Sequence, residues 1–519
     1  MKIQKKISVC CNKKFFILLS FVLLKFLLQY FLINSEYDLH RDEYLHLDQA
    51  YHLAWGYVSV PPFTSWISYL INVLGNSIFW VKFFPALFGA LTIVVVWKAV
   101  EELSGNLFAL ILSATSVLFS AILITNTLYQ PNSFDILSWT TVYFILIKYF
   151  KTEKLKWLYI SALVFGIGFL NKYNIVFLLI GFVPAILLTH HRKIFAKKEF
   201  YFALILGLLF ILPNLLWQYE NNFPVIRHLT ELTDTQLVNF NRLDFLKKQI
   251  FFFIGSLFVI IVALFALLFY KPFEKYKVFF FAIIFTLMVF TCFRAKGYYA
   301  MGIYPIYITF GSVFIENILN NGWKKYLQPV FIIIPVLFFI PIYNISSPNK
   351  NPEYIVNHQQ EYQKYGALRW EDGKDHSLPQ DFADMLGWEE LATIVDTVCS
   401  EVTDINHTFI FCDNYGQAGA INYYTKNKQI RAYSYSADYI NWLPLDTKIE
   451  NVILVKEDFY DNDRNREKQI PLFDTVYLAA KRINQYARED TISVYVLKGA
   501  KIDVNKIIKN DIDQRKNYR

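Results

Sequence analysis

The sequence predicts a polytopic α-helical membrane protein that ends in a soluble α/β domain. Of the 519 residues, 55% are hydrophobic and 18% aromatic, which is a higher apolar content than soluble domains usually have. Long apolar runs alternate with short charged loops over the first two thirds of the chain, and the composition becomes mixed from about Ser346. We therefore expect a multi-spanning transmembrane domain at residues 1–345 and a separate α/β domain at 346–519.

The apolar runs of the first domain predict about eleven membrane-spanning helices, because a span needs about 20 such residues. They lie near residues 15–34, 77–100, 106–126, 133–150, 157–171, 173–190, 200–219, 248–270, 277–293, 299–317 and 326–345. The basic start and first apolar run are not followed by a small-residue cleavage site near Ser35. We therefore expect a retained first helix rather than a removed signal peptide.

The basic loops predict the orientation of these helices. The net charge of +8 could suggest a nucleic-acid partner, but the Lys and Arg residues lie mainly in short loops between apolar runs, which is a topology signal. If the N-terminus is cytoplasmic, every inner loop except the Glu101–Gly105 turn is basic. The inner loops would hold Lys2, Lys5, Lys6, Lys13, Lys14, Lys148, Lys151, Lys154, Lys156, Arg192, Lys193, Lys197, Lys198, Lys271, Lys275, Lys277, Lys324 and Lys325. An odd number of spans then places the terminal domain outside.

The external segment at residues 35–76 carries the first polar group of interest. From Tyr44 to Gly56 the aromatic and apolar residues recur at helical spacing, which predicts an amphipathic helix lying along the membrane surface. Pro61 and Pro62 then enforce an extended turn. Asp42 stands just before this helix, where it could serve as an N-cap, and capping does not exclude a catalytic role.

Polar residues that are out of place in so apolar a chain all fall on the predicted outer side. They are Asp42, Glu43, Asp135, Lys172, Tyr173, Arg294, Lys296, Tyr298 and Tyr299. Asp135 falls at the start of an apolar span, where a charge is costly unless it is paired or hydrated, although a helix N-terminus also favours a carboxylate. Lys172 and Lys296 could instead extend toward lipid headgroups. Their common placement favours a single site at the water–lipid boundary.

Carboxylates and lysines at an outer boundary are suited to a lipid-phosphate substrate. A cation can neutralise a departing phosphate, and a carboxylate can take the proton of an attacking hydroxyl. No nucleotide-phosphate loop appears in the sequence, so we expect a lipid-linked sugar donor. The alternatives are a transporter or lipid flippase, and a noncatalytic receptor. A transporter or flippase should place ionisable residues near mid-membrane. The predicted spans are nearly free of such residues there.

Several segments resemble the bacterial relatives of dolichyl-phosphate-mannose protein mannosyltransferases. The first is RDEYLHLDQAYHLAWGYVSVPPFTSWI, and others are YQPNSFDIL, GIGFLNKYNIVFLL, PNLLWQYENNFPVIRH, FRAKGYYAMGIYPIY, LPQDFADMLGWEELA and DNYGQAGAINYY. This group comprises glycosyltransferase family 39 and the 4-amino-4-deoxy-L-arabinose transferases, within the C-type (GT-C) glycosyltransferase superfamily. The resemblance covers nearly the whole chain.

The resemblance implies a GT-C fold and an inverting enzyme of the bacterial cytoplasmic membrane, with a cytoplasmic N-terminus and a periplasmic terminal domain. It implies that Asp42, next to Glu43, is the catalytic base or orients the acceptor, and that Asp135 completes the pocket. Lys296 with Tyr298 or Tyr299 is implied to hold the phosphate of a polyprenyl-phosphate sugar, with Lys172 as a further candidate. The chain has Val60 where relatives often carry a polar residue, which leaves the sugar open. The acceptor (protein, lipid A or another glycan) and the need for a divalent ion are also open.

The terminal domain is predicted to combine a helix at 381–403 and a second helix after Asp413 with strands at 408–412, 429–435, 451–456 and 493–497. Asp413 and Gln417 are expected to serve the turn and helix cap rather than the chemistry. The cysteines show no metal-ligand spacing, so no metal site is predicted. A disulfide between Cys399 and Cys412 is left open, although nothing in the sequence supports it. The Lys-rich stretch after Val504 is expected to be a solvated tail.

Overall fold

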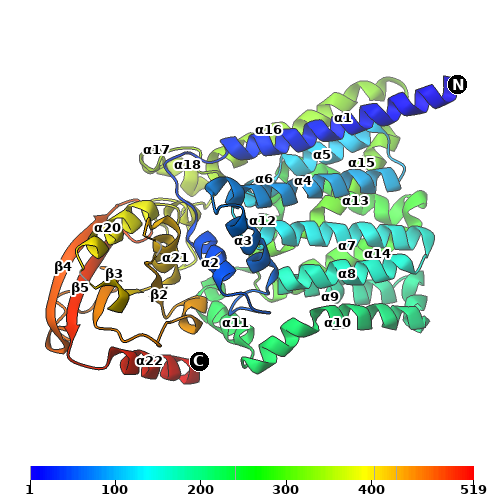
Figure 1. Cartoon of the computed structure of the whole chain (residues 1–519). Helices are drawn as coiled ribbons and strands as arrows, with labels where there is room; N and C mark the ends of the chain where they lie inside the picture. The colour runs from blue at the N-terminus through cyan, green and yellow to red at the C-terminus, as the bar shows by residue number, and fades with distance from the viewer. Residues whose placement is uncertain (1, 240, 403, 428, 519) are drawn as a thin grey trace.

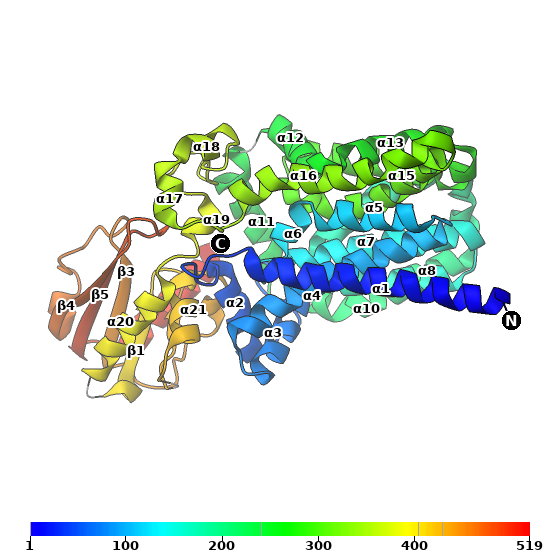
Figure 2. The same ribbon diagram turned by 90° about the horizontal axis from the view of Figure 1, so that it is seen from above.

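The computed structural model describes residues 2–239, 241–402, 404–427 and 429–518, with side chains within 13–516. A long helical bundle is joined at one end to a separate sheet domain, and the N-terminus lies at the other end (Figure 1). The view from above shows the same division (Figure 2). The predicted arrangement, an α-helical part followed by an α/β domain, is thus present.

Every predicted apolar segment forms one or two helices. They are α1 (Lys2–Phe31), α4 (Ile78–Glu102), α5 (Leu107–Leu118), α6 (Ala121–Thr125), α7 (Asn132–Thr152), α8 (Lys156–Asn171), α9 (Val176–Leu187), α10 (Lys198–Glu220), α12 (Arg242–Phe252), α13 (Leu257–Phe269), α14 (Lys277–Cys292), α15 (Tyr304–Leu319) and α16 (Gln328–Ser346). Among the described residues, six helices are long and apolar enough to cross a membrane, or up to eight if each of two bent pairs counts as one span. The number of actual crossings stays a prediction.

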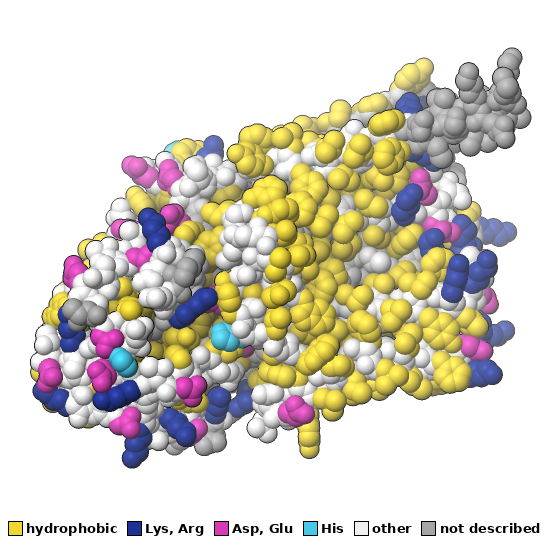
Figure 3. Space-filling view, viewed as in Figure 1, with side chains coloured by type: hydrophobic (Ala, Val, Ile, Leu, Met, Phe, Trp, Pro, Cys, Tyr) yellow, Lys and Arg dark blue, Asp and Glu magenta, His cyan; other side chains and the backbone are white. Residues whose placement is uncertain are grey.

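The basic loops gather at the end of the bundle away from the sheet domain (Figure 3). The acidic turn at Glu101–Gly105, the exception in the charge pattern, is neutralised there. Glu102 pairs with Lys148 at 3.1 Å and Lys151 at 2.7 Å. The basic loops of the bundle are therefore concentrated at one end, as the orientation prediction requires.

One lysine does not fit the expectation that the spans are nearly free of ionisable groups. Lys25 lies inside α1 and is only 2% exposed. Its ammonium group donates to Gln29 one turn later. A Cβ on Gly89 of α4 would come within 2.6 Å of the Lys25 side chain, so the absence of a side chain at that position makes room for the lysine.

The external segment between α1 and α4 differs from its prediction. The helix α2 spans Arg41–Asp48, followed by the 3₁₀ turn η1 (Gln49–Tyr51) and by α3 (Phe63–Val73). It begins earlier and ends earlier than expected, and its N-cap is His40 rather than Asp42, with Glu43 completing a capping box. Its residues from Glu43 to Asp48 are buried, because α2 lies between the bundle and the sheet domain (Figure 1).

The terminal domain holds a five-stranded mixed sheet in the order β2-β1-β3-β5-β4. Its strands are β1 (Thr408–Cys412), β2 (Ala432–Ser434), β3 (Asn451–Glu457), β4 (Phe473–Ile483) and β5 (Thr491–Ala500). β1 pairs in parallel with β2 and β3, whereas β5 runs antiparallel to β3 and β4. Helices α20 (Trp388–Ser400) and α21 (Tyr415–Tyr424) cover one face, and α22 (Val504–Tyr518) covers the other. Short helices α17 (Pro352–Asn357), α18 (Gln359–Lys364) and α19 (Gln380–Ala383) precede them.

Three parts of this domain were not predicted correctly. The helix expected at 381–403 is divided into α19 and α20. The stretch after Val504 is a helix whose Val504 and Ile508 are buried against the sheet, so it is not a solvated tail. The strand β4 was missed, because it lies at the sheet edge and most of its residues are at least partly exposed, without a clear apolar alternation. Cys399 and Cys412 are both buried free thiols.

Candidate active site

Asp42 is a partly exposed carboxylate with several neighbours that favour its charged form. Its side chain is 38% exposed. The Oδ1 atom accepts a hydrogen bond of 2.7 Å from the hydroxyl of Tyr415, and Oδ2 accepts one of 3.2 Å from Gln130. Burial opposes ionisation, but His40, the Tyr415 hydroxyl and Arg41 together hold the pKa of Asp42 below its ordinary value. The group is therefore ionised at neutral pH and reachable, as a general base must be.

Glu43, the adjacent residue, is completely buried, and both of its carboxylate oxygens accept hydrogen bonds. Both of its oxygens lie 2.8 Å from the ammonium group of Lys82 on α4. It also accepts from the backbone N–H groups of Tyr129 at 2.6 Å and His40 at 2.7 Å. These contacts assign Glu43 to fastening α2 onto the bundle, and they leave its carboxylate no open side for substrate.

Asp135 lies in the first turn of α7 and is 3% exposed. It accepts hydrogen bonds from the indole of Trp139 at 3.1 Å and from the amide of Asn174 at 2.9 Å. The same Asn174 amide also donates to the backbone oxygen of Tyr299 at 2.9 Å. Asn174 therefore ties Asp135 to the segment that carries Tyr298 and Tyr299. Asp135 lies at the start of a helix, as the sequence predicted, and its part in the pocket stays a prediction; the sequence gave no signal for Asn174.

Lys172 connects this region to Asp42. Its ammonium group donates to Asn132 at 2.7 Å, Asn132 donates to Gln130 at 2.9 Å, and Gln130 donates to Asp42. The ammonium group also lies over the rings of Tyr298 and Tyr299, at 5.0 and 4.6 Å from their centroids, an arrangement that stabilises a cation. The side chains of Asp42, Gln130, Asn132 and Lys172 are thus joined by successive hydrogen bonds, and we call this group of four side chains the polar chain.

Lys296 joins the bundle to the terminal domain. It donates to Gln236 at 2.8 Å and pairs with Glu371 at 2.5 Å. Burial would lower its pKa, but Glu371 and Tyr299 act in the opposite direction, and on balance the pKa of Lys296 is raised. Asp42 is close enough to raise it further, so Lys296 is a fixed cation on the same side as the polar chain.

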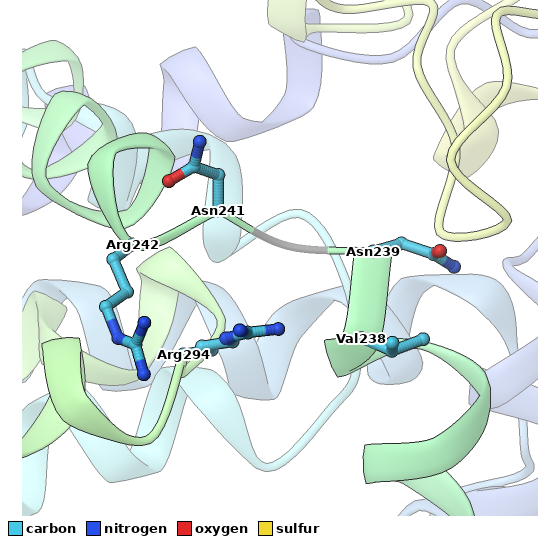
Figure 4. Close-up of a pocket in the computed structure, with 5 residues that line it drawn as sticks. All are labelled: Val238, Asn239, Asn241, Arg242 and Arg294. Atoms are coloured by element: carbon cyan, nitrogen blue, oxygen red, sulfur yellow. The ribbon is translucent and has the colours of Figure 1, made fainter.

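Arg294 and Tyr173 stand apart from the polar chain. Arg294 lines a cavity of about 430 Å³ beside the segment η4 (Leu237–Asn239), together with Val238, Asn239, Asn241 and Arg242 (Figure 4). The hydroxyl of Tyr173 donates to Asn214 at 3.1 Å and accepts from Gln218 at 2.9 Å, both on α10. Tyr173 therefore packs between helices, whereas Arg294 remains accessible to an anion near Lys296.

The residues near His40 include a donor set that resembles a metal site. His40, Asp381 and Asp384 could surround one ion. However, the Nδ1 atom of His40 accepts the backbone N–H of Asp42 at 3.1 Å, which places the proton of a neutral imidazole on Nε2, the atom that faces the two carboxylates. Asp384 is also held by Arg488 at 3.1 Å. Nε2 lies 3.7 Å from Asp384 and 3.9 Å from Asp381, so this donor set suits a cluster of charge contacts better than a metal ion.

Asp413 and Gln417 both make structural contacts in the turn before α21, but the helix cap expected of them is Asn414. Asp413 pairs with Lys456 and accepts the backbone N–H of Glu457 at 2.8 Å. Gln417 accepts the backbone N–H of Asp413 at 3.0 Å, and the cap of α21 is Asn414. Neither belongs to the polar chain.

Comparison with known proteins supports a glycosyltransferase. The family model described as dolichyl-phosphate-mannose-protein mannosyltransferase matches residues 59–217, which include Asp135 and Lys172 but not Asp42 or Lys296. The lipid A galacturonosyltransferase RgtD of Rhizobium johnstonii is 23% identical over 226 residues, which cover 41% of this chain and 46% of that protein. The match thus spans about half the length of this curated relative.

Crystal structures of ArnT from Cupriavidus metallidurans, one without ligand and one bound to undecaprenyl phosphate, share the fold. Each has a TM-score of 0.60 and 12% identity, covering 92% of this chain and 97% of ArnT. The expected GT-C fold is therefore confirmed. So is the resemblance to mannosyltransferase-like, ArnT-related membrane glycosyltransferases.

Proposed function

We propose that this protein transfers a sugar, with inversion, from a polyprenyl-phosphate-linked donor to an acceptor at the outer face of the bacterial cytoplasmic membrane. The observation that carries the proposal is the polar chain, which joins an ionised, partly exposed Asp42 to the cation Lys172 through Gln130 and Asn132. A base and a phosphate-binding cation stand at one boundary, as a displacement at a sugar carbon requires.

In the proposed reaction Asp42 takes the proton of an acceptor hydroxyl, and the oxygen of that hydroxyl forms a bond to the anomeric carbon of the donor sugar. The bond between that carbon and the phosphate oxygen breaks on the opposite side, and the polyprenyl phosphate leaves with the electron pair. Lys172 and Lys296 neutralise the charge that grows on the phosphate. Tyr298 and Tyr299 hold Lys172, and Asp135 fixes the position of that segment through Asn174.

The orientation proposed for this reaction follows from the charge distribution. The basic loops lie at the end of the bundle away from the terminal domain (Figure 3), and by the positive-inside rule this supports a periplasmic terminal domain. A donor bound there is delivered from the outer leaflet, which fits the lipid-phosphate class. ArnT, which shares the fold, was crystallised with undecaprenyl phosphate.

A vesicle experiment tests the proposal. The purified protein is reconstituted with bacterial membrane lipids that contain polyprenyl-phosphate sugars, and mass spectrometry follows the sugar on lipid and protein acceptors. The proposal predicts new covalently linked sugar and release of polyprenyl phosphate in equal amounts. Movement of unmodified lipid between leaflets without any transfer would contradict it and would support a flippase instead.

A further inference from the structure

A second cleft lies at the opposite end of α2 from Asp42. It has a volume of about 150 Å³ and is lined on one side by Asp48, Tyr51 and His52 of the external segment. Its other side is formed by terminal-domain residues that include Asn422, Arg431 and Trp442. The cleft is thus built jointly by the membrane domain and the sheet domain, and none of the residues of the polar chain enters it.

Aromatic rings form the wall of this cleft. The imidazole of His52 stacks on the indole of Trp442 with 4.3 Å between centroids and 9° between planes. The guanidinium group of Arg431 lies 4.3 Å from the centroid of the Tyr51 ring. Tyr433 and Tyr439 complete the lining. Flat apolar faces beside a few oriented polar groups are typical of small-molecule sites.

Asp48 provides an oriented acceptor within this wall. Its Oδ2 atom accepts hydrogen bonds from the hydroxyl of Tyr439 at 2.5 Å and from the amide of Asn422 at 2.6 Å. Among the described residues none donates a hydrogen bond to Oδ1, since Arg431 stands 3.9 Å away. The carboxylate is therefore held in place through one oxygen, and the other lies 3.9 Å from an arginine, a distance that a hydroxyl placed beside both groups can bridge.

We propose that this cleft binds one uncharged sugar residue of a glycan acceptor. The ring would place its apolar face against the aromatic wall, and neighbouring hydroxyls would donate to Asp48 and accept from Arg431. Hydrogen bonds from a hydroxyl to a carboxylate are among the stronger neutral-ligand contacts. A sugar with no net charge is favoured because the negative charge of Asp48 is already balanced by the positive charge of Arg431.

The position of the cleft relative to Asp42 gives it a use in the proposed function, on which this inference rests. Asp42 and Asp48 are six residues apart on α2, about 9 Å along the helix axis. Helix α21 runs beside α2 in the same direction, with Tyr415 bonded to Asp42 and Asn422 bonded to Asp48. A glycan held at the cleft would be kept at a fixed distance from the base by two paired helices.

Binding is tested with the full-length protein in lipid nanodiscs, because many detergents carry sugar headgroups. Saturation-transfer NMR is recorded with glucose, galactose, mannose, arabinose and oligosaccharides released from bacterial membrane glycolipids. We expect at least one saccharide to bind, and Trp442→Ala to weaken it at least tenfold. Trp323→Ala is the matched control, since Trp323 is 69% exposed in the turn η8 (Gly322–Leu327) at the other end of the bundle. Arg431→Gln serves as the second variant if Trp442→Ala does not fold.

The outcomes separate this inference from the proposed function. If the parent binds no saccharide, or if the cleft variants bind as the parent does, the inference is wrong even when sugar transfer occurs. If a saccharide binds through the cleft while no transfer is detected, the inference holds and the proposed function fails. Where transfer is measured, the cleft variants should raise the acceptor KM and leave kcat within about threefold, because the cleft touches neither Asp42 nor the donor.

Discussion

Asp42 and Glu43 are adjacent in the chain, but their carboxylates lie in opposite surroundings. Glu43 is enclosed by Lys82 and two backbone N–H groups, whereas Asp42 keeps more than a third of its side chain exposed. Sequence reasoning identified both acids and could not separate their roles. The separation depends on Lys82, which is 39 residues further along the chain, and on Tyr415, which comes from the terminal domain.

Tyr415 donates a hydrogen bond to Asp42, the proposed base, so Tyr415→Phe should change the pH dependence of transfer. The hydroxyl donates to Asp42 and helps to hold its pKa below the ordinary value. Removing it raises that pKa, so the acidic limb of the pH–rate profile should move to higher pH, with less than about tenfold loss of rate at the optimum. The profile of kcat/KM measures this. An unshifted limb would show that Asp42 is not the group that titrates.

Lys82 is predicted to matter for stability. Lys82→Met leaves the buried Glu43 unpaired, which costs about 3–5 kcal/mol. Thermal unfolding should therefore occur at a clearly lower temperature than in the parent. The double variant Glu43→Gln, Lys82→Met removes both charges and should recover much of the loss. A double variant no more stable than Lys82→Met alone would argue against the pairing seen in the structure.

At the scale of elements, the pairing of α2 with α21 positions Asp42, the proposed base. The two helices approach closely because α21 has glycine where they meet. A Cβ at Gly419 would lie 2.7 Å from the Cβ of Tyr44 and 2.8 Å from the hydroxyl of Tyr439, which is closer than real contacts allow. Neither neighbour can move freely, since Tyr44 is in α2 and Tyr439 bonds Asp48.

Gly419→Ala should therefore separate α21 from α2 and displace Tyr415 from Asp42. We expect transfer to fall at least tenfold while the helical bundle stays folded, as judged by circular dichroism and size-exclusion chromatography. The matched control is Gly207→Ala in α10, where the nearest atoms lie at 3.6 and 3.7 Å, an ordinary contact distance. Equal activity of both variants would mean that the helix pair does not position the base.

Elements with a strong apolar signal were predictable, and those defined by tertiary contacts were not. The helices of the bundle and the strand β1 follow from runs of apolar residues, and β1 has the predicted bounds. Helix α2 was assigned the wrong ends because its buried face contacts another domain, which no local period reveals. Lys25 was overlooked because a single lysine in an apolar run looks like a tolerated exception.

At the scale of the whole molecule, the basic loops and the candidate active site lie at opposite ends of the helical bundle. The proposed orientation assigns these two ends to opposite sides of the membrane. Lys193 is exposed in the turn η3 (His190–Ala196), and Thr393 is exposed on α20 in the terminal domain. The proposed orientation places them in different compartments. Their positions can be tested because both side chains are accessible.

Single cysteines introduced as Lys193→Cys and Thr393→Cys, in a chain whose own cysteines are replaced by serine, should label differently. A membrane-impermeant maleimide applied to right-side-out vesicles should react with position 393 and should reach position 193 only after permeabilisation. Comparable labelling of both positions before permeabilisation would contradict the orientation.

The most direct measurement compares sugar transfer by the parent, Asp42→Asn and the control Asp474→Asn, using purified protein and a polyprenyl-phosphate sugar donor. Asparagine keeps the shape of the side chain but cannot accept the proton of the acceptor. The account predicts that Asp42→Asn lowers kcat about 10²- to 10⁴-fold while the protein still binds the donor lipid. Asp474 is exposed at the sheet edge, so its variant should transfer normally. Transfer by Asp42→Asn at the parent rate would contradict the account.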